Sequence, residues 1–166
     1  MKKSFYICLA SLLLVSPAIH SQSSEQISKL LETPRASVAQ ASYIAAVYKD
    51  LIPDSSQNSG FSTEGSSSDS ELQAFQALKD KGYFSSSVSA DDQITLDQAC
   101  FTYAKVLDIK GGLFYTLFPS KRYAFKEFKA KNLIPPTADP STKMSGRDTL
   151  DLFNSAMNFA EGASKW

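Results

Sequence analysis

The carboxylates are the side chains in this sequence that could perform acid–base chemistry. Asp91 and Asp92 are adjacent, and Asp97 and Asp148 each fall near the expected start of a helix. Hydrolysis of a glycosidic bond needs two carboxylates held at a set separation, and the spacing of these residues does not indicate such a pair. Because adjacent Asp residues in a loop are commonly a solvated turn, we predict that the chain has no catalytic residue and is not an enzyme.

Other catalytic and metal-binding chemistries lack the residues that they need. The sequence contains one histidine, His20, and two cysteines, Cys8 and Cys100. His20 and Cys8 lie in a segment that we expect to be removed, and without histidine the Ser-His-Asp and Cys-His arrangements are impossible. Transition-metal sites normally use His or Cys, and Asp91 and Asp92 do not belong to a calcium-binding loop. We therefore predict no metal and no cofactor, and we interpret Cys100 as a small core residue.

The basic side chains are better candidates for a binding site. Arginine occurs at three positions, Arg35, Arg122 and Arg147, and two of them fall at the expected starts of long helices. Since a helix start disfavours a cation electrostatically, Arg35 and Arg147 could mark an anionic partner, although their stems could equally pack on apolar surface. Tyr123, beside Arg122, could stack on a sugar or a peptide. The candidate ligand-binding residues are therefore Arg35, Arg122, Tyr123 and Arg147.

The net charge argues against nucleic acid as the partner. The sequence contains 17 basic and 17 acidic residues. Loss of Lys2 and Lys3 with the N-terminal segment would leave the chain slightly acidic. Nucleic-acid binders usually show a basic patch or stripe, whereas Glu127 interrupts the basic stretch at residues 121–131. We interpret that stretch as a solvated helix face.

The N-terminus is typical of a secretory signal peptide. Lys2 and Lys3 are followed by an apolar run over residues 5–15 and then by small residues. This order matches the basic, apolar and small-residue regions of such a peptide, and we place the cut after residue 21. An uncleaved N-terminal anchor is the alternative. No later segment has the roughly 20 apolar residues that span a bilayer, so we expect an exported protein, either periplasmic or at the cell surface.

A repeat of fifty residues organises the second half of the chain. The segment AFQALKDKGYF at 74–84 aligns without a gap with AFKEFKAKNLI at 124–134. Gly82 and Asn132 match because both suit the left-handed residue that ends a helix. Further on, ITLDQ at 94–98 aligns with MSGRD at 144–148, where Thr95 and Ser145 are plausible helix caps. The pattern predicts helices near 71–81, 96–108, 121–131 and 146–160.

The first half of the chain contains a partial copy of the same unit. Thr33 followed by Pro34 has a hydroxyl cap and then proline at the first helical position, which predicts a helix near 34–51. A segment in which half of residues 55–70 are serine follows. Such a composition buries little, and we expect a flexible linker there.

The connection between the second and third units is unusually apolar. Residues 111–119 read GGLFYTLFP. This segment could be a short strand or helix tucked into the core, or an exposed aromatic lip. Burial is the favoured interpretation because contiguous exposed apolar patches are uncommon. If the lip is exposed, Phe114 and Phe118 would form an interaction surface.

These units resemble S-layer homology modules. Such a module has a short helix ending near a Lys-Gly pair, an irregular loop with an acidic residue, and an Ile-Thr cap that opens a longer helix. Residues 78–84 (LKDKGYF), then 91–95 (DDQIT), then Ala99 follow that order. The segments at 111–118 and 122–134 also resemble uncharacterised exported proteins of spirochaete envelopes.

The resemblance implies a fold and a ligand. S-layer homology modules usually occur in threes, form a pseudo-threefold helical prong and bind cell-wall polysaccharide in grooves between repeats. In that family an Arg follows the Thr of the cap. Here Pro34, Leu96 and Gly146 would hold the Arg position, while Arg35 and Arg147 would sit one place further on. This departure concerns the ligand site more than the fold.

We therefore expect an all-α protein made of about three helix–loop–helix repeats, the first partial, in one compact domain after a signal peptide. The expected segments are a signal peptide at 1–21, a first partial repeat at 22–52, a linker at 53–70, a second repeat at 71–110, an apolar connection at 111–120 and a third repeat at 121–166. The expected function is a non-enzymatic cell-envelope module that binds cell-wall polysaccharide or anchors a partner. The alternative is a periplasmic subunit that binds an envelope protein and no glycan.

Overall fold

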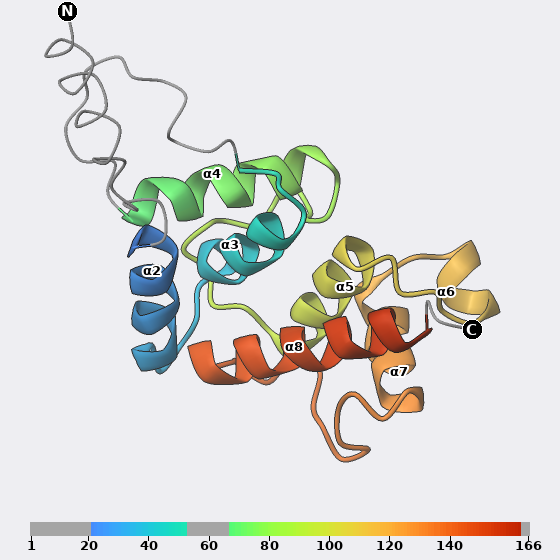
Figure 1. The fold of residues 1–166 in the computed structure, drawn as a ribbon. Coiled ribbons are helices and arrows are strands. Elements are labelled where there is room, and N and C mark those ends of the chain that lie inside the picture. Colours follow the sequence, from blue (N-terminus) through green and yellow to red (C-terminus); the bar gives the residue numbers. More distant parts are fainter. Residues whose placement is uncertain (1–20, 53–66, 164–166) are drawn as a thin grey trace, which may run out of the picture.

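The computed structural model describes residues 21–52 and 67–163, and this part of the chain is a compact arrangement of seven helices without strands (Figure 1). The predicted all-α class is therefore confirmed. The predicted signal peptide and most of the serine-rich linker lie outside the described residues. The helices are α2 (Ser21–Glu32), α3 (Val38–Tyr48), α4 (Ser67–Asp80), α5 (Leu96–Val106), α6 (Leu113–Leu117), α7 (Lys121–Ala130) and α8 (Gly146–Ala163).

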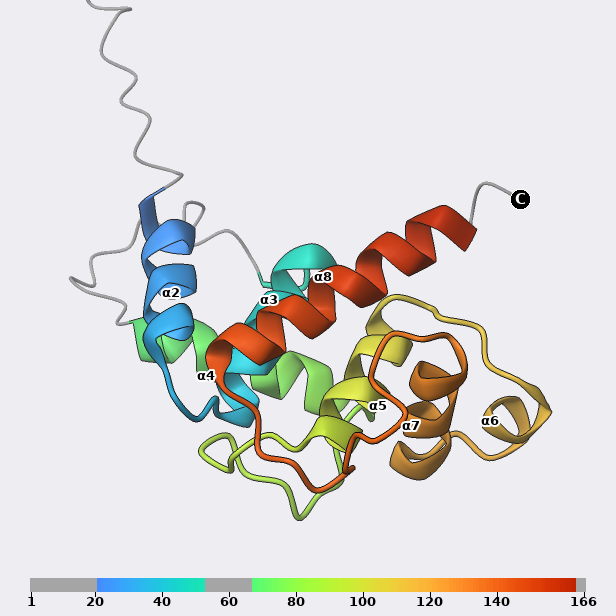
Figure 2. The ribbon, with the colours of Figure 1, turned by 90° about the horizontal axis from the view of Figure 1, so that it is seen from below.

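Three helices form the centre of the fold, and three others cover them. Helices α3, α5 and α8 contact one another, and each carries one outer helix. Helix α4 packs on α3, α7 packs on α5, and α2 packs on α8 (Figures 1 and 2). The apolar side chains at three- and four-residue spacing on the central helices, such as Ala99, Tyr103 and Val106 of α5, are buried there.

The segments that lead into the three central helices are joined by a closed ring of backbone hydrogen bonds. The Ala36 amide donates to the Met144 carbonyl at 2.9 Å, the Met144 amide to the Ile94 carbonyl at 3.2 Å, and the Ile94 amide to the Ala36 carbonyl at 3.1 Å. All three residues are buried. Buried backbone groups need partners, and here each segment supplies them to the next. We call these three hydrogen bonds the loop ring.

A second set of hydrogen bonds fixes the start of each central helix. The first amides of an α-helix have no partner inside the helix. In this fold Val38 donates to the Asp92 carbonyl at 2.8 Å, Leu96 to the Thr142 carbonyl at 2.9 Å, and Gly146 to the Thr33 carbonyl at 2.9 Å. The loop before one central helix therefore caps another central helix, which makes the three starts depend on one another.

Contacts recur at the fifty-residue offset between α4 and α7. Gly82 and Asn132, which follow these helices, have φ angles of 74° and 57°, the left-handed conformation that was predicted for both. Lys79 lies over the Phe75 ring at 5.1 Å, and its counterpart Lys129 lies over the Phe125 ring at 4.7 Å. Matching positions are also buried in both segments: Ala74 and Ala124, Phe75 and Phe125, Leu78 and Phe128, Phe84 and Ile134.

The predicted start of the first long helix was wrong by four residues. Helix α3 begins at Val38, and its cap is Ser37, whose hydroxyl accepts from the Gln40 amide while the Gln40 side chain accepts from the Ser37 amide. Thr33 instead follows α2, and its hydroxyl donates to the Lys29 carbonyl at 2.8 Å. A capping box satisfies two amides at once, so Ser37 is the better helix start.

Two further boundaries differ from the prediction. Helix α4 begins at Ser67, so the last residues assigned to the flexible linker are helical. Helix α2 was not predicted as a separate helix, yet it covers α8 and ends where Gly146 meets the Thr33 carbonyl. Helix α2 is joined to α3 by a loop that is much shorter than the loops after α4 and α7.

Candidate functional site

A pocket of about 310 Å³ lies between α8, the loop that leads into it, and the start of α5. Its apolar lining comes from Leu96, Leu133, Ile134, Pro135, Met144 and Leu152, and its polar lining from Thr142, Asp148, Asp151 and Ser155. An apolar lining with a few polar groups is the usual character of a small-ligand site. Two lining residues also hold the fold together. Met144 belongs to the loop ring, and Leu96 is the first residue of α5, whose amide donates to the Thr142 carbonyl. The hydrogen bonds between the loops therefore position the pocket.

Three of the four polar lining residues of the pocket stand in one row on α8. Asp148, Asp151 and Ser155 are three and four residues apart, a spacing that places side chains on one face of a helix. Asp148 also completes the cap of α8, because one of its carboxylate oxygens accepts from the Ser145 hydroxyl at 2.7 Å and the Ser145 hydroxyl accepts from the Asp148 amide at 3.1 Å. Asp151 and Ser155 are exposed and remain available to a ligand.

The predicted arginine sites do not line this pocket. Arg35, Arg122 and Arg147 are all exposed. Arg147 lies in the first turn of α8, next to Asp148. Arg35 lies in the loop before the Ser37 cap, so it is not at a helix start, and its predicted equivalence to Arg147 was wrong. The physical reason is the capping box at Ser37, which shifts the first unit four residues along the chain.

The fourth predicted ligand residue belongs to a different surface. Tyr123 on α7 is half-buried and stacks on Phe114 of α6, with ring centroids 5.9 Å apart and 13° between the planes. The Lys126 ammonium lies over the Tyr123 ring, 5.8 Å from its centroid. The structure therefore joins Tyr123 to the predicted interaction residue Phe114.

The preferred interpretation of residues 111–119 as core was wrong, and the exposed lip is what the structure shows. Four side chains of this segment are largely open to solvent: Leu113 at 69%, Phe114 at 64%, Leu117 at 59% and Phe118 at 63% exposure. We call these four residues the apolar lip. Only Tyr115 turns inward and packs against the core, and a Cβ on Gly111 would lie 2.5 Å from its ring. Glycine at 111 thus makes room for Tyr115.

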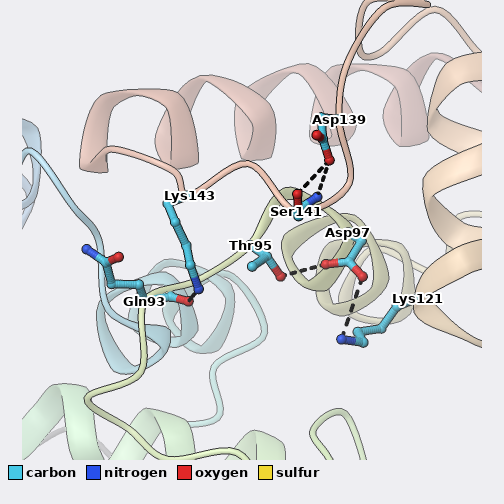
Figure 3. A network of polar contacts seen from close by, with 7 residues as sticks. All are labelled: Gln93, Thr95, Asp97, Lys121, Asp139, Ser141 and Lys143. Atoms are coloured by element: carbon cyan, nitrogen blue, oxygen red, sulfur yellow. Dashed lines mark hydrogen bonds and ion pairs between the residues drawn. The ribbon is translucent and has the colours of Figure 1, made fainter.

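Two of the carboxylates considered for catalysis, Asp92 and Asp97, make local hydrogen bonds, as does Asp139 in the loop before α8; Figure 3 shows Asp97 and Asp139. Asp97 accepts from the Thr95 hydroxyl at 2.5 Å and pairs with Lys121 at 3.6 Å. Asp92 accepts from the Ser89 amide at 2.8 Å. Asp139 accepts from the amide and hydroxyl of Ser141, which lower the pKa of its carboxyl. Hydrogen bonds to the charged form have this effect.

Lys143 links two loops in the same region. Its ammonium donates to the Gln93 carbonyl at 3.3 Å (Figure 3), beside the backbone bridge between Thr95 and Lys143. Cys100 is buried among core residues, and burial raises the pKa of its thiol. A thiol in that state is a poor nucleophile. Within residues 21–52 and 67–163, no group of three His, Cys, Asp or Glu side chains could hold a metal ion.

Comparison with known protein families, with curated proteins and with solved structures finds no match to this chain. Among the helices described here, none is both long and apolar enough to cross a membrane.

Proposed function

We propose that this chain is a non-enzymatic, exported module of the cell envelope that is built like a set of three S-layer homology repeats and binds cell-wall glycan at the pocket beside α8. The observation that carries the proposal is the loop ring, because three equivalent backbone positions, Ala36, Ile94 and Met144, close on one another in turn. A closed ring of three loops is the arrangement expected of three repeats around a pseudo-threefold axis.

The pairing of helices supports the same repeat architecture. Each of the three central helices carries one outer helix, and the second and third units share contacts at the fifty-residue offset. With Ser37 as the cap of α3, the three segments correspond more closely than the sequence predicted. Ser37, Thr95 and Ser145 each come directly after a residue of the loop ring. Gln40 and Asp148 follow Ser37 and Ser145 by three residues and make the reciprocal hydrogen bonds of a capping box, whereas the Thr95 hydroxyl makes no such cap bond and donates to Asp97.

The pocket fits a sugar better than it fits a purely apolar ligand. An apolar floor from Leu133, Ile134 and Leu152 can contact the C–H face of a sugar ring, while Asp151 and Ser155 can bond its hydroxyls. In the family that this chain resembles, the residue after the cap is Arg; here it is Val38, Leu96 or Gly146. Ligand contacts in this chain must therefore come from other groups. Arg147, adjacent to Asp148, offers a cation for a carboxylate on the polymer.

The proposal predicts that the exported form, residues 22–166, co-sediments with cell-wall sacculi isolated from the organism that encodes it. The double variant Asp151→Ala/Ser155→Ala should lose at least about tenfold in apparent affinity, because a site built to bond hydroxyls loses roughly 1.4 kcal/mol or more when such bonds are removed. The variant Arg147→Ala tests the contribution of the cation next to Asp148, and it should weaken binding if the polymer carries a carboxylate.

The matched control is Asn154→Ala/Glu161→Ala, which changes two exposed residues of the same helix outside the pocket lining. It should bind like the unmodified protein. If the unmodified protein stays in solution, or if the pocket variant sediments as well as the control, glycan binding at this pocket is contradicted.

A further inference from the structure

The apolar lip is presented on a short helix at one extremity of the fold. Helix α6 (Leu113–Leu117) stands beside α7 and away from the three central helices (Figures 1 and 2). Its position is fixed from within: the Gly112 amide donates to Glu127 at 2.8 Å, and Phe114 stacks on Tyr123. These contacts hold the helix in place with its four apolar side chains facing outward. A partner that binds them therefore does not have to order this segment first.

Three basic side chains lie next to the lip in the sequence or contact its neighbour Tyr123. Lys110 precedes it, Arg122 follows it on α7, and Lys126 lies over the Tyr123 ring that stacks on Phe114. All three are exposed, and within the described residues none of them is paired with a carboxylate.

The acidic groups close to the lip are already engaged by other cations. Glu127 pairs with Lys131 at 3.2 Å, and Asp97 pairs with Lys121 at 3.6 Å. The surface around the lip therefore carries an excess of positive charge, contributed by Lys110, Arg122 and Lys126.

We propose that this surface docks on an anionic lipid bilayer. The side chains of Leu113, Phe114, Leu117 and Phe118 would enter the region between the headgroups and the acyl chains, while Lys110, Arg122 and Lys126 contact phosphate groups. Peripheral membrane binding combines buried apolar area with attraction of basic residues to anionic lipid, and both are present here. This function is additional to glycan binding and uses a different surface of the chain.

The small size of the lip favours a bilayer over a folded protein as its partner. A stable protein interface buries about 800 Å² on each side and needs a surface of complementary shape. A single five-residue helix with four protruding side chains offers little of that area. A bilayer adapts to a protruding group, so insertion needs no matching pocket.

The test is co-sedimentation of the exported form, residues 22–166, with lipid vesicles. Vesicles of phosphatidylglycerol mixed with phosphatidylcholine should bind the protein at least about tenfold more tightly than pure phosphatidylcholine, and added salt should weaken that binding because it screens the basic residues. The variant Phe114→Ser/Phe118→Ser should lose at least tenfold in binding, and Lys110→Glu/Arg122→Glu should abolish the preference for anionic lipid.

The control variant is Leu72→Ser, which replaces another exposed apolar residue, 53% exposed, on α4. It should bind vesicles like the unmodified protein, and circular dichroism should show the same helix content in every form. The proposal is overturned if anionic vesicles leave the unmodified protein in solution, or if the Phe114→Ser/Phe118→Ser variant binds as well as the control. Co-purification of a protein through Phe114 and Phe118 without vesicle binding would also overturn it. Sedimentation with sacculi should be unchanged in the lip variants, so the two proposals can fail separately.

Discussion

Replacing Gly146 with alanine is expected to lower the free energy of unfolding by about 3 kcal/mol, because the start of α8 has no room for a side chain. A Cβ at this position would lie 1.7 Å from the Leu30 carbonyl oxygen and 2.6 Å from its carbon. These atoms belong to the backbone of α2 and cannot rotate away. Helix α2 would have to move off α8, and the 2.9 Å hydrogen bond from Gly146 to Thr33 would be lost with that movement.

The measurement is chemical denaturation of Gly146→Ala beside Gly162→Ala. Gly162 lies in the same helix, and a Cβ there would meet nothing within 4 Å. Alanine should therefore be neutral or stabilising at 162, by up to about 1 kcal/mol, since it loses less conformational freedom on folding than glycine does. Equal effects at the two positions would show that α2 does not pack on the start of α8 as described.

Replacing Phe128 with alanine is expected to cost about 4 kcal/mol of stability, because it removes a fully buried ring from between α5 and α7. Phe128 has no exposed surface, and its helix α7 packs on α5. Phe118 is the matched control: it is the same residue type, lies 63% exposed on the apolar lip, and should change stability by less than about 0.5 kcal/mol when replaced by alanine.

Thermal or chemical unfolding of the Phe128→Ala and Phe118→Ala variants measures this contrast. A large loss at Phe118 would mean that the apolar lip packs on the rest of the chain, which would contradict both the exposed lip and its proposed role at a bilayer. A small loss at Phe128 would contradict the packing of α7 on α5.

The helix ends that the sequence predicted well are those marked by a local signal. Helix α5 begins after Thr95 as expected, and α7 ends before Asn132, whose left-handed conformation was predicted from its match to Gly82. In these segments the apolar period and the terminal residues agree. Such agreement between local signals is what makes a sequence pattern reliable.

The first unit was predicted less well because two helix starts compete there. Two local patterns are both acceptable helix starts in isolation. One is Thr33 followed directly by Pro34, and the other is Ser37 with Gln40 three residues later. The choice depends on the loop ring, since Ala36 must reach both Ile94 and Met144. Those residues are distant in sequence, so a local pattern cannot weigh them. The resulting four-residue error produced the wrong equivalence of Arg35 and Arg147.

The candidate sites depend on tertiary contacts even more strongly. The pocket beside α8 draws its lining from residues spread between Leu96 and Ser155, and no short motif marks them together. For the apolar lip, composition identified the segment correctly but favoured burial. Exposure followed from the fold, in which Tyr115 is the residue of this helix that reaches the core.

The closure of the three units into one ring is the claim on which the proposed function rests, and amide hydrogen exchange of Ala36, Ile94 and Met144 tests it most directly. These amides make the three hydrogen bonds of the loop ring. If the ring forms, all three amides should exchange only when the whole domain unfolds, at rates at least about 10³ times slower than those of a free amide. The free energies of opening calculated from the three rates should then be equal. Rapid exchange at Ala36, with slow exchange at Ile94 and Met144, would show that the first unit does not close the ring and would contradict the account.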